Sequence, residues 1–290
     1  MTRDLVGYRV VAVHAHPDDE ALFTGGTLAD FARRGAEVTV ITATLGEEGE
    51  VIGDRLQGLV VDAADQLGGA RVRELDDSLR ALGVRGIQLG GFGHFRDSGM
   101  DGDAGPASLV GRVDEAADVL RTELDRLRPH IILTYGPDGG YGHPDHIAVH
   151  EVTHQAAGST PVWWCIYHRP SFYAALEHIT PPPQWEFPDK AYLDNYTNAD
   201  FDVEVPLDDA AVAAKRRALA AHPTQVWVGD GTVTATNPEA AWAVCQNPAE
   251  APCAYALSNR LVMPVLRREH YQWGGERPAP ASLLEGVDRG

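Results

Sequence analysis

Two short segments of this 290-residue chain combine histidine, proline and aspartate, and each follows a run of apolar residues. The first segment, residues 16–20, comes shortly after the β-branched run at residues 10–13, and the second, residues 141–146, follows the run at residues 131–135. Such runs are typical of strands that are buried on both faces. Open α/β sheets bind their ligands at the carboxyl ends of these strands, so we expect the two segments to meet at one crevice.

The side chains of the two segments suit a catalytic metal site. Zinc binds imidazole nitrogen and carboxylate oxygen, and His16 and Asp19 supply one of each. A third ligand is expected from the segment at residues 141–146. A site with two histidines and one aspartate leaves one position of the metal open for water. Asp18 is then free to act as a base.

Each motif alone has a simpler explanation. An aspartate after a strand often caps the following helix, and a single histidine is often an ordinary polar or core residue. Two motifs of the same type, both at a strand-to-helix junction, favour the metal site over these explanations.

The elements that would position these motifs alternate between strands and helices. Alternation of this kind predicts an α/β fold with a Rossmann-like, mostly parallel sheet, right-handed crossovers and flanking helices. A dinucleotide-binding loop is not expected, because the G-x-G-x-x-G pattern is absent. The predicted strands are residues 8–15, 37–44, 87–89, 130–135 and 162–167, and the predicted helices are residues 25–34, 54–68, 77–82, 110–128, 144–157 and 208–221.

Two connections have the composition and position expected of site walls. Residues 46–53 are rich in glycine and glutamate and follow the second predicted strand. Residues 90–106 form a glycine-rich connection that is longer than usual, and such connections are often functional. Because this connection contains aromatic residues and a methionine, we expect it to contact substrate.

The composition of the chain changes near residue 170. Three prolines at positions 181–183 stiffen the chain, and the sequence up to residue 209 is polar and proline-rich. We therefore expect a Rossmann-like catalytic domain with the metal site at residues 1–170. A smaller C-terminal domain at residues 171–290 is expected to pack over one side of the site.

The overall charge and the cysteine content limit the possible partners. A net charge of −18 disfavours binding to nucleic acid and to anionic membrane surfaces. Three cysteines are few and odd in number, which is typical of a reducing compartment. The sequence shows no apolar run long enough to span a membrane and no signal peptide. These features predict a cytoplasmic protein that acts on a small molecule, and they leave its oligomeric state undetermined.

The paired motifs resemble those of the LmbE-like superfamily of zinc-dependent de-N-acetylases. Four further segments are similar to the N-acetylglucosaminyl-inositol deacetylases of mycothiol biosynthesis, and the resemblance covers roughly residues 8–272. It implies a hydrolase that removes the acetyl group from N-acetylglucosaminyl-inositol. The four segments are residues 46–55, 65–69, 95–100 and 221–226.

The resemblance also implies roles for individual residues. His16, Asp19 and His146 are expected to hold one zinc ion, although Fe²⁺ accepts the same ligand types. Asp18 is expected to be the general base. The remaining expected contacts are those of Tyr141 and His143 with the oxyanion, of Asp145 with His143, and of Arg71, Asp97, Glu50 and Met100 with the substrate.

Three alternatives remain open on the sequence alone. One is a mycothiol S-conjugate amidase, and a second is a deacetylase of another N-acetylated aminosugar or natural product. The third is a sugar-binding module with a structural metal, which Asp18 disfavours because an unneeded carboxylate beside Asp19 adds repulsion. His222 lies in one of the similar segments, and the sequence assigns it no role.

Overall fold

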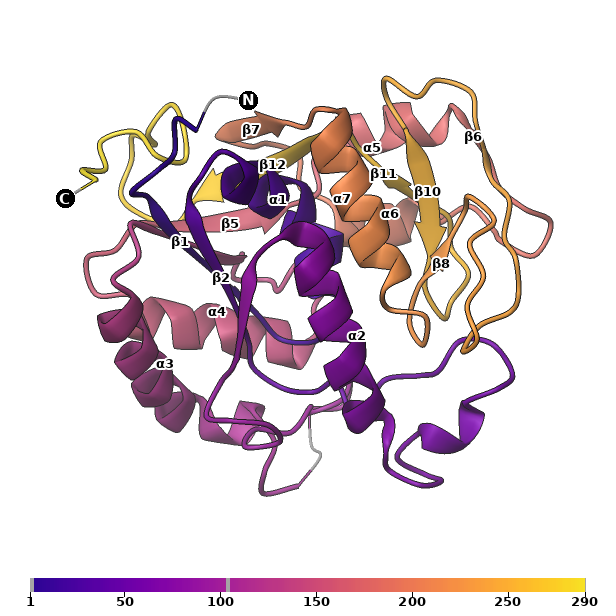
Figure 1. The fold of residues 1–290 in the computed structure, drawn as a ribbon, viewed down its shortest axis with the longest axis horizontal. Helices are drawn as coiled ribbons and strands as arrows, with labels where there is room; N and C mark the ends of the chain where they lie inside the picture. Colours follow the sequence, from indigo (N-terminus) through magenta and orange to yellow (C-terminus); the bar gives the residue numbers. More distant parts are fainter. Residues whose placement is uncertain (1–2, 103–104, 290) are drawn as a thin grey trace.

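A seven-stranded sheet in the order β3-β2-β1-β4-β5-β12-β7 organises the fold (Figure 1). The computed structural model describes residues 3–102 and 105–289. Five neighbouring strands run parallel, and helices on both faces bury the apolar side chains of all but the edge strand β3. This arrangement confirms the predicted Rossmann-like, mostly parallel sheet. The parallel strands are β1 (Arg9–His14), β2 (Glu37–Thr42), β3 (Arg85–Gln88), β4 (Ile131–Tyr135) and β5 (Val162–Ile166).

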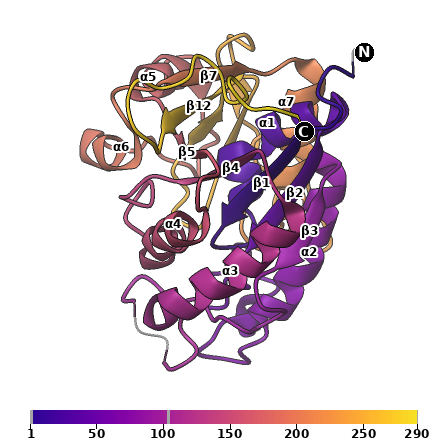
Figure 2. The same ribbon diagram turned by 90° about the vertical axis from the view of Figure 1, so that its left-hand side faces the viewer.

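Helices cover both faces of the sheet (Figure 2). One layer contains α3 (Val113–Leu127) and α4 (Pro144–Ala156), which pack against each other. The opposite layer contains α1 (Gly25–Arg33), α2 (Leu67–Leu82) and α7 (Asp209–Ala220). No helix in the described parts of the chain is both long and apolar enough to cross a membrane.

The helix predicted at residues 54–68 is wrong. Residues 54–66 contain only a short 3-10 turn, η2 (Gln57–Leu59), and the side chains of Leu56, Leu59 and Val60 stay partly exposed. The helix α2 begins at Leu67 instead, and the predicted helix at residues 77–82 is its last part. Its buried face alternates leucines with the polar residues Arg71, Glu74 and Ser78, so the hydrophobic pattern alone does not reveal it.

The segment at residues 90–106 is only partly a surface connection. Phe95, Asp97 and Ser98 are buried, and an isolated bridge pairs Arg96 with Ser108. Residues 103 and 104 of this predicted loop lie outside the described part of the chain. A short turn, η3 (Val110–Arg112), then leads into α3.

Two strands from beyond residue 170 join the main sheet. The strand β12 (Arg268–Trp273) pairs antiparallel with β5 on one side and with β7 (Val203–Pro206) on the other. The division near residue 170 stays a prediction. The other elements of this region are α5 (Arg169–Leu176), β6 (Ile179–Thr180), α6 (Lys190–Tyr196), β8 (Trp227–Val228), β9 (Val244–Cys245), β10 (Cys253–Ala256) and β11 (Met263–Val265).

A carboxylate on β12 fixes the start of α1. The two oxygens of Glu269 accept the backbone N–H groups of Gly26 at 2.9 Å and Thr27 at 2.8 Å. The buried ammonium group of Lys215, on α7, donates to the same carboxylate at 2.6 Å. A negative charge satisfies the free N–H groups at a helix N-terminus, so this contact anchors α1 and the turn before it.

Candidate metal centre and active site

His16, Asp19 and His146 bring three ligand atoms together beyond the carboxyl ends of β1 and β4. The Nε2 atom of His146 lies 3.3 Å from Oδ2 of Asp19 and 3.3 Å from Nδ1 of His16. The Nδ1 atom of His16 lies 3.6 Å from the same Asp19 oxygen. Tetrahedral zinc with bonds of about 2.0–2.1 Å requires ligand atoms about 3.4 Å apart. The three groups therefore fit one divalent metal ion.

The other contacts of the two histidines leave Nδ1 of His16 and Nε2 of His146 available to bind a metal ion. The Nδ1 atom of His146 pairs with the carbonyl of Gly139 at 3.0 Å, which leaves Nε2 unprotonated for a metal. On His16, Nε2 lies 3.3 Å from Asp145 and 3.5 Å from Asp97, which leaves Nδ1 free. Buried carboxylates behind a histidine ligand typically fix its tautomer and orientation.

Asp19 is held from two sides. Its Oδ2 atom accepts the backbone N–H of His16 at 2.9 Å and the hydroxyl of Tyr135 at 2.6 Å. The ring of Tyr135 also stacks on His146, with ring centroids 4.1 Å apart. Tyr135 thus contacts both a carboxylate and an imidazole of the donor set, and it was missed by the sequence analysis. Its place at the end of a predicted strand was the available signal.

His143 is a further nitrogen donor near this set. Nitrogens of His16, His143 and His146 all lie within 4.8 Å of one another. The Nδ1 atom of His143 accepts the N–H of Asp145 at 3.1 Å at the start of α4, so its Nε2 atom carries the proton. Burial, with His16 and His146 nearby, lowers the pKa of His143 to about 3. A neutral histidine in this tautomer is suited to donate a hydrogen bond.

The predicted contact between the Asp145 side chain and His143 is not present. The carboxylate of Asp145 faces His16 and accepts the N–H of Ser98 at 2.9 Å. Only the backbone N–H of Asp145 reaches His143. The geometry at the N-terminus of α4 explains this difference, because His143 is itself the N-cap and its ring accepts from the first turn.

Asp18 lies beside the donor set in an unusual backbone conformation. Its φ angle is 118°, in a region that residues other than glycine rarely adopt. Burial raises the pKa of Asp18 to about 6, against the opposing effect of the Arg71 guanidinium, which lies 3.2 Å from its carboxylate. A carboxylate with a pKa near the working pH is suited to general acid–base chemistry.

His16, Asp18, Asp19 and His143 line a cavity of about 140 Å³, whereas His146 is fully buried and is not among the described lining residues. Tyr141 stacks on Tyr196 from α6, with ring centroids 5.5 Å apart, so the region after residue 170 contributes one wall. The sequence analysis missed Tyr196 and Gln225 as wall residues. The full lining is His16, Asp18, Asp19, Leu22, Phe23, Gly49, Arg71, Asp97, Tyr141, His143, Tyr196, Gln225, Leu257 and Ser258.

The four predicted substrate residues are divided between this cavity and its surroundings. Arg71 and Asp97 line the cavity, although Arg71 also donates to the carbonyls of Pro17 and Gly46. Glu50 is exposed and lines a neighbouring cavity of about 360 Å³. Met100 is 63% exposed and does not belong to the described lining of the metal-site cavity.

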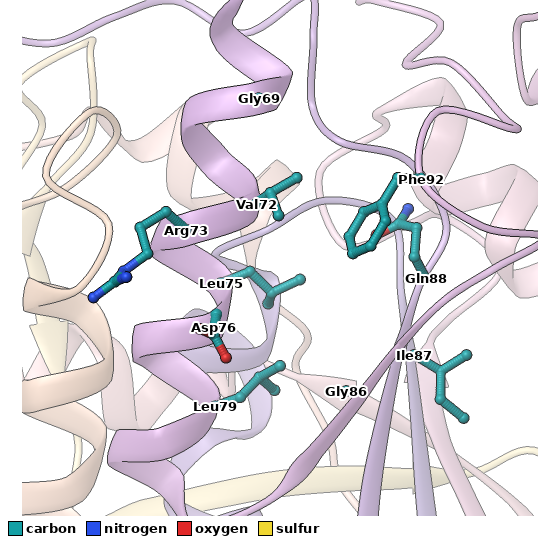
Figure 3. A pocket seen from close by; sticks show the side chains of 10 residues that line it. All are labelled: Gly69, Val72, Arg73, Leu75, Asp76, Leu79, Gly86, Ile87, Gln88 and Phe92. Atoms are coloured by element: carbon teal, nitrogen blue, oxygen red, sulfur yellow. The ribbon is translucent and has the colours of Figure 1, made fainter.

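A larger cavity of about 430 Å³ lies between α2 and β3 (Figure 3). The side chains of Val72, Leu75 and Leu79 extend from the helix towards Ile87 and Phe92. Among its described lining residues there is one carboxylate and no histidine. The smaller cavity therefore remains the candidate for chemistry.

Comparison with known proteins identifies relatives that match almost the whole length of the chain. The PIG-L family, described as GlcNAc-PI de-N-acetylase, matches residues 11–157. A protein from Corynebacterium glutamicum (strain R), named 1D-myo-inositol 2-acetamido-2-deoxy-alpha-D-glucopyranoside deacetylase, is 49% identical over 99% of both chains. The protein of the same name from Corynebacterium efficiens is 51% identical over 98% of this chain and 94% of its own.

Solved structures share the fold at lower identity. A deacetylase–bog complex from the biosynthesis pathway of teicoplanin is 23% identical, with a TM-score of 0.51 over 74% of this chain and 84% of its own. The zinc-inhibited form of a teicoplanin deacetylase is 20% identical, with a TM-score of 0.50 and the same coverage. These two structures support the sheet architecture described above.

Proposed function

The chain belongs to the PIG-L family of de-N-acetylases, and we propose that it hydrolyses the acetamide of 1D-myo-inositol 2-acetamido-2-deoxy-alpha-D-glucopyranoside to the free amine and acetate. The observation that carries this proposal is the set of three ligand atoms from His16, Asp19 and His146. Asp18 lines the same cavity as His16 and Asp19. Two full-length relatives named for this reaction support the substrate.

His16, Asp19 and His146 are proposed to hold the metal ion. When bound, a divalent ion supplies Lewis-acid polarisation of the amide carbonyl and makes water more acidic. Zinc is the proposed ion because its ligand types and spacing match, and Fe²⁺ remains the alternative because it accepts the same ligands.

Asp18 is proposed to accept the proton of the attacking water and to deliver it to the departing amine. Amides need this second transfer because an amine anion is a poor leaving group. The buried position of Asp18 favours the transfer, since it raises the pKa of the carboxyl to about 6. The Arg71 guanidinium limits how far the carboxylate can move.

His143 and Tyr141 are proposed to donate hydrogen bonds to the oxygen that becomes negative during attack. His143 carries its proton on Nε2, because Nδ1 accepts the N–H of Asp145. Tyr141 lines the same cavity, and burial keeps its pKa well above the ordinary value, so it remains a donor. Donors fixed in place before reaction stabilise such an oxygen strongly.

A deacetylation assay tests the proposed function. Metal-free protein is reconstituted with Zn²⁺ or, under anaerobic conditions, with Fe²⁺. Acetate release is then measured with the inositol glucosaminide, N-acetylglucosamine and a mycothiol S-conjugate. We expect the highest kcat/KM for the inositol glucosaminide and loss of activity with a chelator. Faster cleavage of the S-conjugate, or activity that survives without metal, would contradict the proposal.

A further inference from the structure

A histidine and a glutamate outside the proposed catalytic set form a buried pair directly behind Asp18. Glu20 begins the π-helical turn η1 (Glu20–Thr24), and His222 follows α7, 202 positions later in the chain. Both side chains are 0% exposed, and Nε2 of His222 lies 2.8 Å from Oε1 of Glu20. Burial of such groups is unfavourable unless they find partners, so their contact is a specific feature of the fold.

The same glutamate holds the main chain of Asp18. The Oε2 atom of Glu20 accepts the N–H of Asp18 at 3.0 Å. On the other side, the carbonyl of Asp18 accepts the N–H groups of Ala21 and Leu22, both at 2.9 Å. A positive φ angle at an aspartate persists only where the surrounding structure enforces it. Glu20 supplies one of these contacts.

Glu20 is itself oriented by two donors from distant elements. Its Oε1 atom accepts from His222 and from the hydroxyl of Ser78 on α2. With both donors on Oε1, the second oxygen faces the N–H of Asp18. His222 thus contacts the carboxylate of Glu20, which in turn accepts the backbone N–H of Asp18, the proposed base.

The turn that carries His222 is firmly anchored. The carbonyl of His222 accepts the N–H groups of Gln225 and Val226 at 2.9 and 2.8 Å. Thr224 donates from its backbone and its hydroxyl to Glu74, at 3.0 and 2.7 Å. These contacts fix the position from which the imidazole reaches Glu20.

From this geometry we infer that His222 is a positioning residue for the deacetylation reaction. Through Glu20 it keeps Asp18 in the backbone conformation that directs the carboxylate into the cavity. The inference rests on the proposed role of Asp18 as the base. It differs from a purely stabilising role, in which loss of His222 would lower the stability of the fold and leave the turnover of the folded protein unchanged.

His270, on β12 of the main sheet, provides a control histidine. His270 is also buried, and its Nε2 atom lies 3.3 Å from a carboxylate oxygen of Glu204. His270 is on β12, opposite Glu204 of β7, and it does not belong to the described lining of the metal-site cavity. His270→Leu therefore removes a buried histidine beside a glutamate without touching the path to Asp18.

The experiment compares His222→Leu, His222→Gln and His270→Leu as metal-loaded full-length proteins. We expect His222→Leu to lower kcat by about 10- to 100-fold with unchanged KM and metal content, because a displacement of about 1 Å can cost about 100-fold in rate. His222→Gln keeps an N–H donor and should recover most of the loss. His270→Leu should lower Tm but keep kcat within about twofold.

Crystal structures of the wild type and His222→Leu supply a readout that does not depend on turnover. We expect Asp18 to leave the positive φ region in the variant. Retention of that angle, a kcat within about twofold of the wild type, or failure of His222→Gln to restore the rate would each overturn the inference.

Two further measurements keep the test decisive. If His222→Leu does not fold, Ser78→Ala can be tested instead, because it removes the other donor to Oε1 of Glu20. We expect Ser78→Ala to lower kcat by about 3- to 10-fold. An unchanged kcat in this variant would refute the role of Glu20. If the wild type lacks deacetylase activity, the proposed function fails, while the φ angle of Asp18 still tests the contact with His222.

Discussion

Asp18 and Asp19 are adjacent carboxylates with opposite surroundings. Although burial acts against it, the neighbouring His146 and His16 hold the pKa of Asp19 well below its usual range. Burial raises the pKa of Asp18 to about 6, although the Arg71 guanidinium 3.2 Å away lowers it. Environments that separate the pKa values of two acids in one site often separate their roles. This contrast supports the roles proposed above, which are metal ligation for Asp19 and proton transfer for Asp18.

Replacement of Asp18 by asparagine should abolish proton transfer and keep the metal. We expect kcat to fall by about 10²- to 10⁴-fold, the usual contribution of general acid–base catalysis. The native rate should rise with pH as Asp18 loses its proton, at or below a pH of about 6, because a bound cation lowers the pKa that burial raises. That acidic limb should be absent from the pH–rate profile of Asp18→Asn. Loss of metal, or a near-native kcat, would contradict the assignment.

The two histidines of the second motif should respond differently to replacement by alanine. His146→Ala should lose most bound metal, because its Nε2 atom lies 3.3 Å from both other donors. His143→Ala should retain the metal and lower kcat, because its proposed role is to donate a hydrogen bond. Metal content measured by mass spectrometry, with a folded state verified by circular dichroism, distinguishes these outcomes. Equal loss of metal in both variants would instead make His143 a ligand.

At the scale of elements, α2 shows where sequence reasoning reaches its limit. Its buried face contains Arg71, Glu74 and Ser78, so the apolar periodicity that marks an amphipathic helix is interrupted. These polar residues are buried because each has a partner in the site or behind it. The five parallel strands and the helices α1, α3, α4 and α7 were predictable, since their buried residues are mostly apolar. The strands β6 to β12 and the helices α5 and α6 were not predicted.

The contacts of α2 change the expectation for Arg71. The sequence predicted a contact with substrate hydroxyls, yet the guanidinium donates to the carbonyls of Pro17 and Gly46 and lies beside Asp18. We expect Arg71→Ala to reduce turnover of the inositol glucosaminide and of a minimal acetamide by similar factors. The free energy of unfolding of Arg71→Ala should fall by about 1.5–3 kcal/mol, because the variant loses the hydrogen bonds of the charged guanidinium.

Arg73 provides the control for this prediction. It lies on the same helix, but it is exposed and pairs only with Asp77 among the described ion pairs. Arg73→Ala should leave both rates and the urea midpoint nearly unchanged. A loss in Arg71→Ala that is confined to the inositol glucosaminide would restore the substrate contact predicted from sequence.

Site residues within the two motifs could be located from the sequence, whereas most of those far from the motifs could not. Residues within the motifs were located by sequence because strand ends in a parallel sheet share one edge. His222 was noticed but received no role, because its partner Glu20 is 202 positions away and only the fold brings them together. Tyr196 and Gln225 were missed for the same reason, since they reach the cavity from the region after residue 170.

At the scale of the whole molecule, the region after residue 170 completes the sheet that holds the site. The strand β12 covers the edge of β5, and its Glu269 holds the start of α1. We therefore expect a fragment of residues 1–170 to lack a cooperative unfolding transition in urea. In the full chain, Glu269→Ala should cost about 3 kcal/mol, because Lys215 is left as an uncompensated buried charge.

Exposed Glu276 supplies the comparison for that substitution. Glu276→Ala should change the free energy of unfolding by less than about 0.5 kcal/mol, as is usual for surface positions. A fragment of residues 1–170 that unfolds cooperatively would instead support the domain boundary predicted from sequence.

The contact between Glu20 and His222 also constrains the order of events during synthesis of the protein. At about 5–20 residues per second, the ribosome needs about 10 to 40 s to add the 202 positions that separate the two residues. During this interval the nascent chain contains His16 and Asp19 but not the imidazole behind Asp18. The cavity can therefore reach its final shape only when the later half of the chain has left the ribosome, so metal loading before that point would meet an unfinished site.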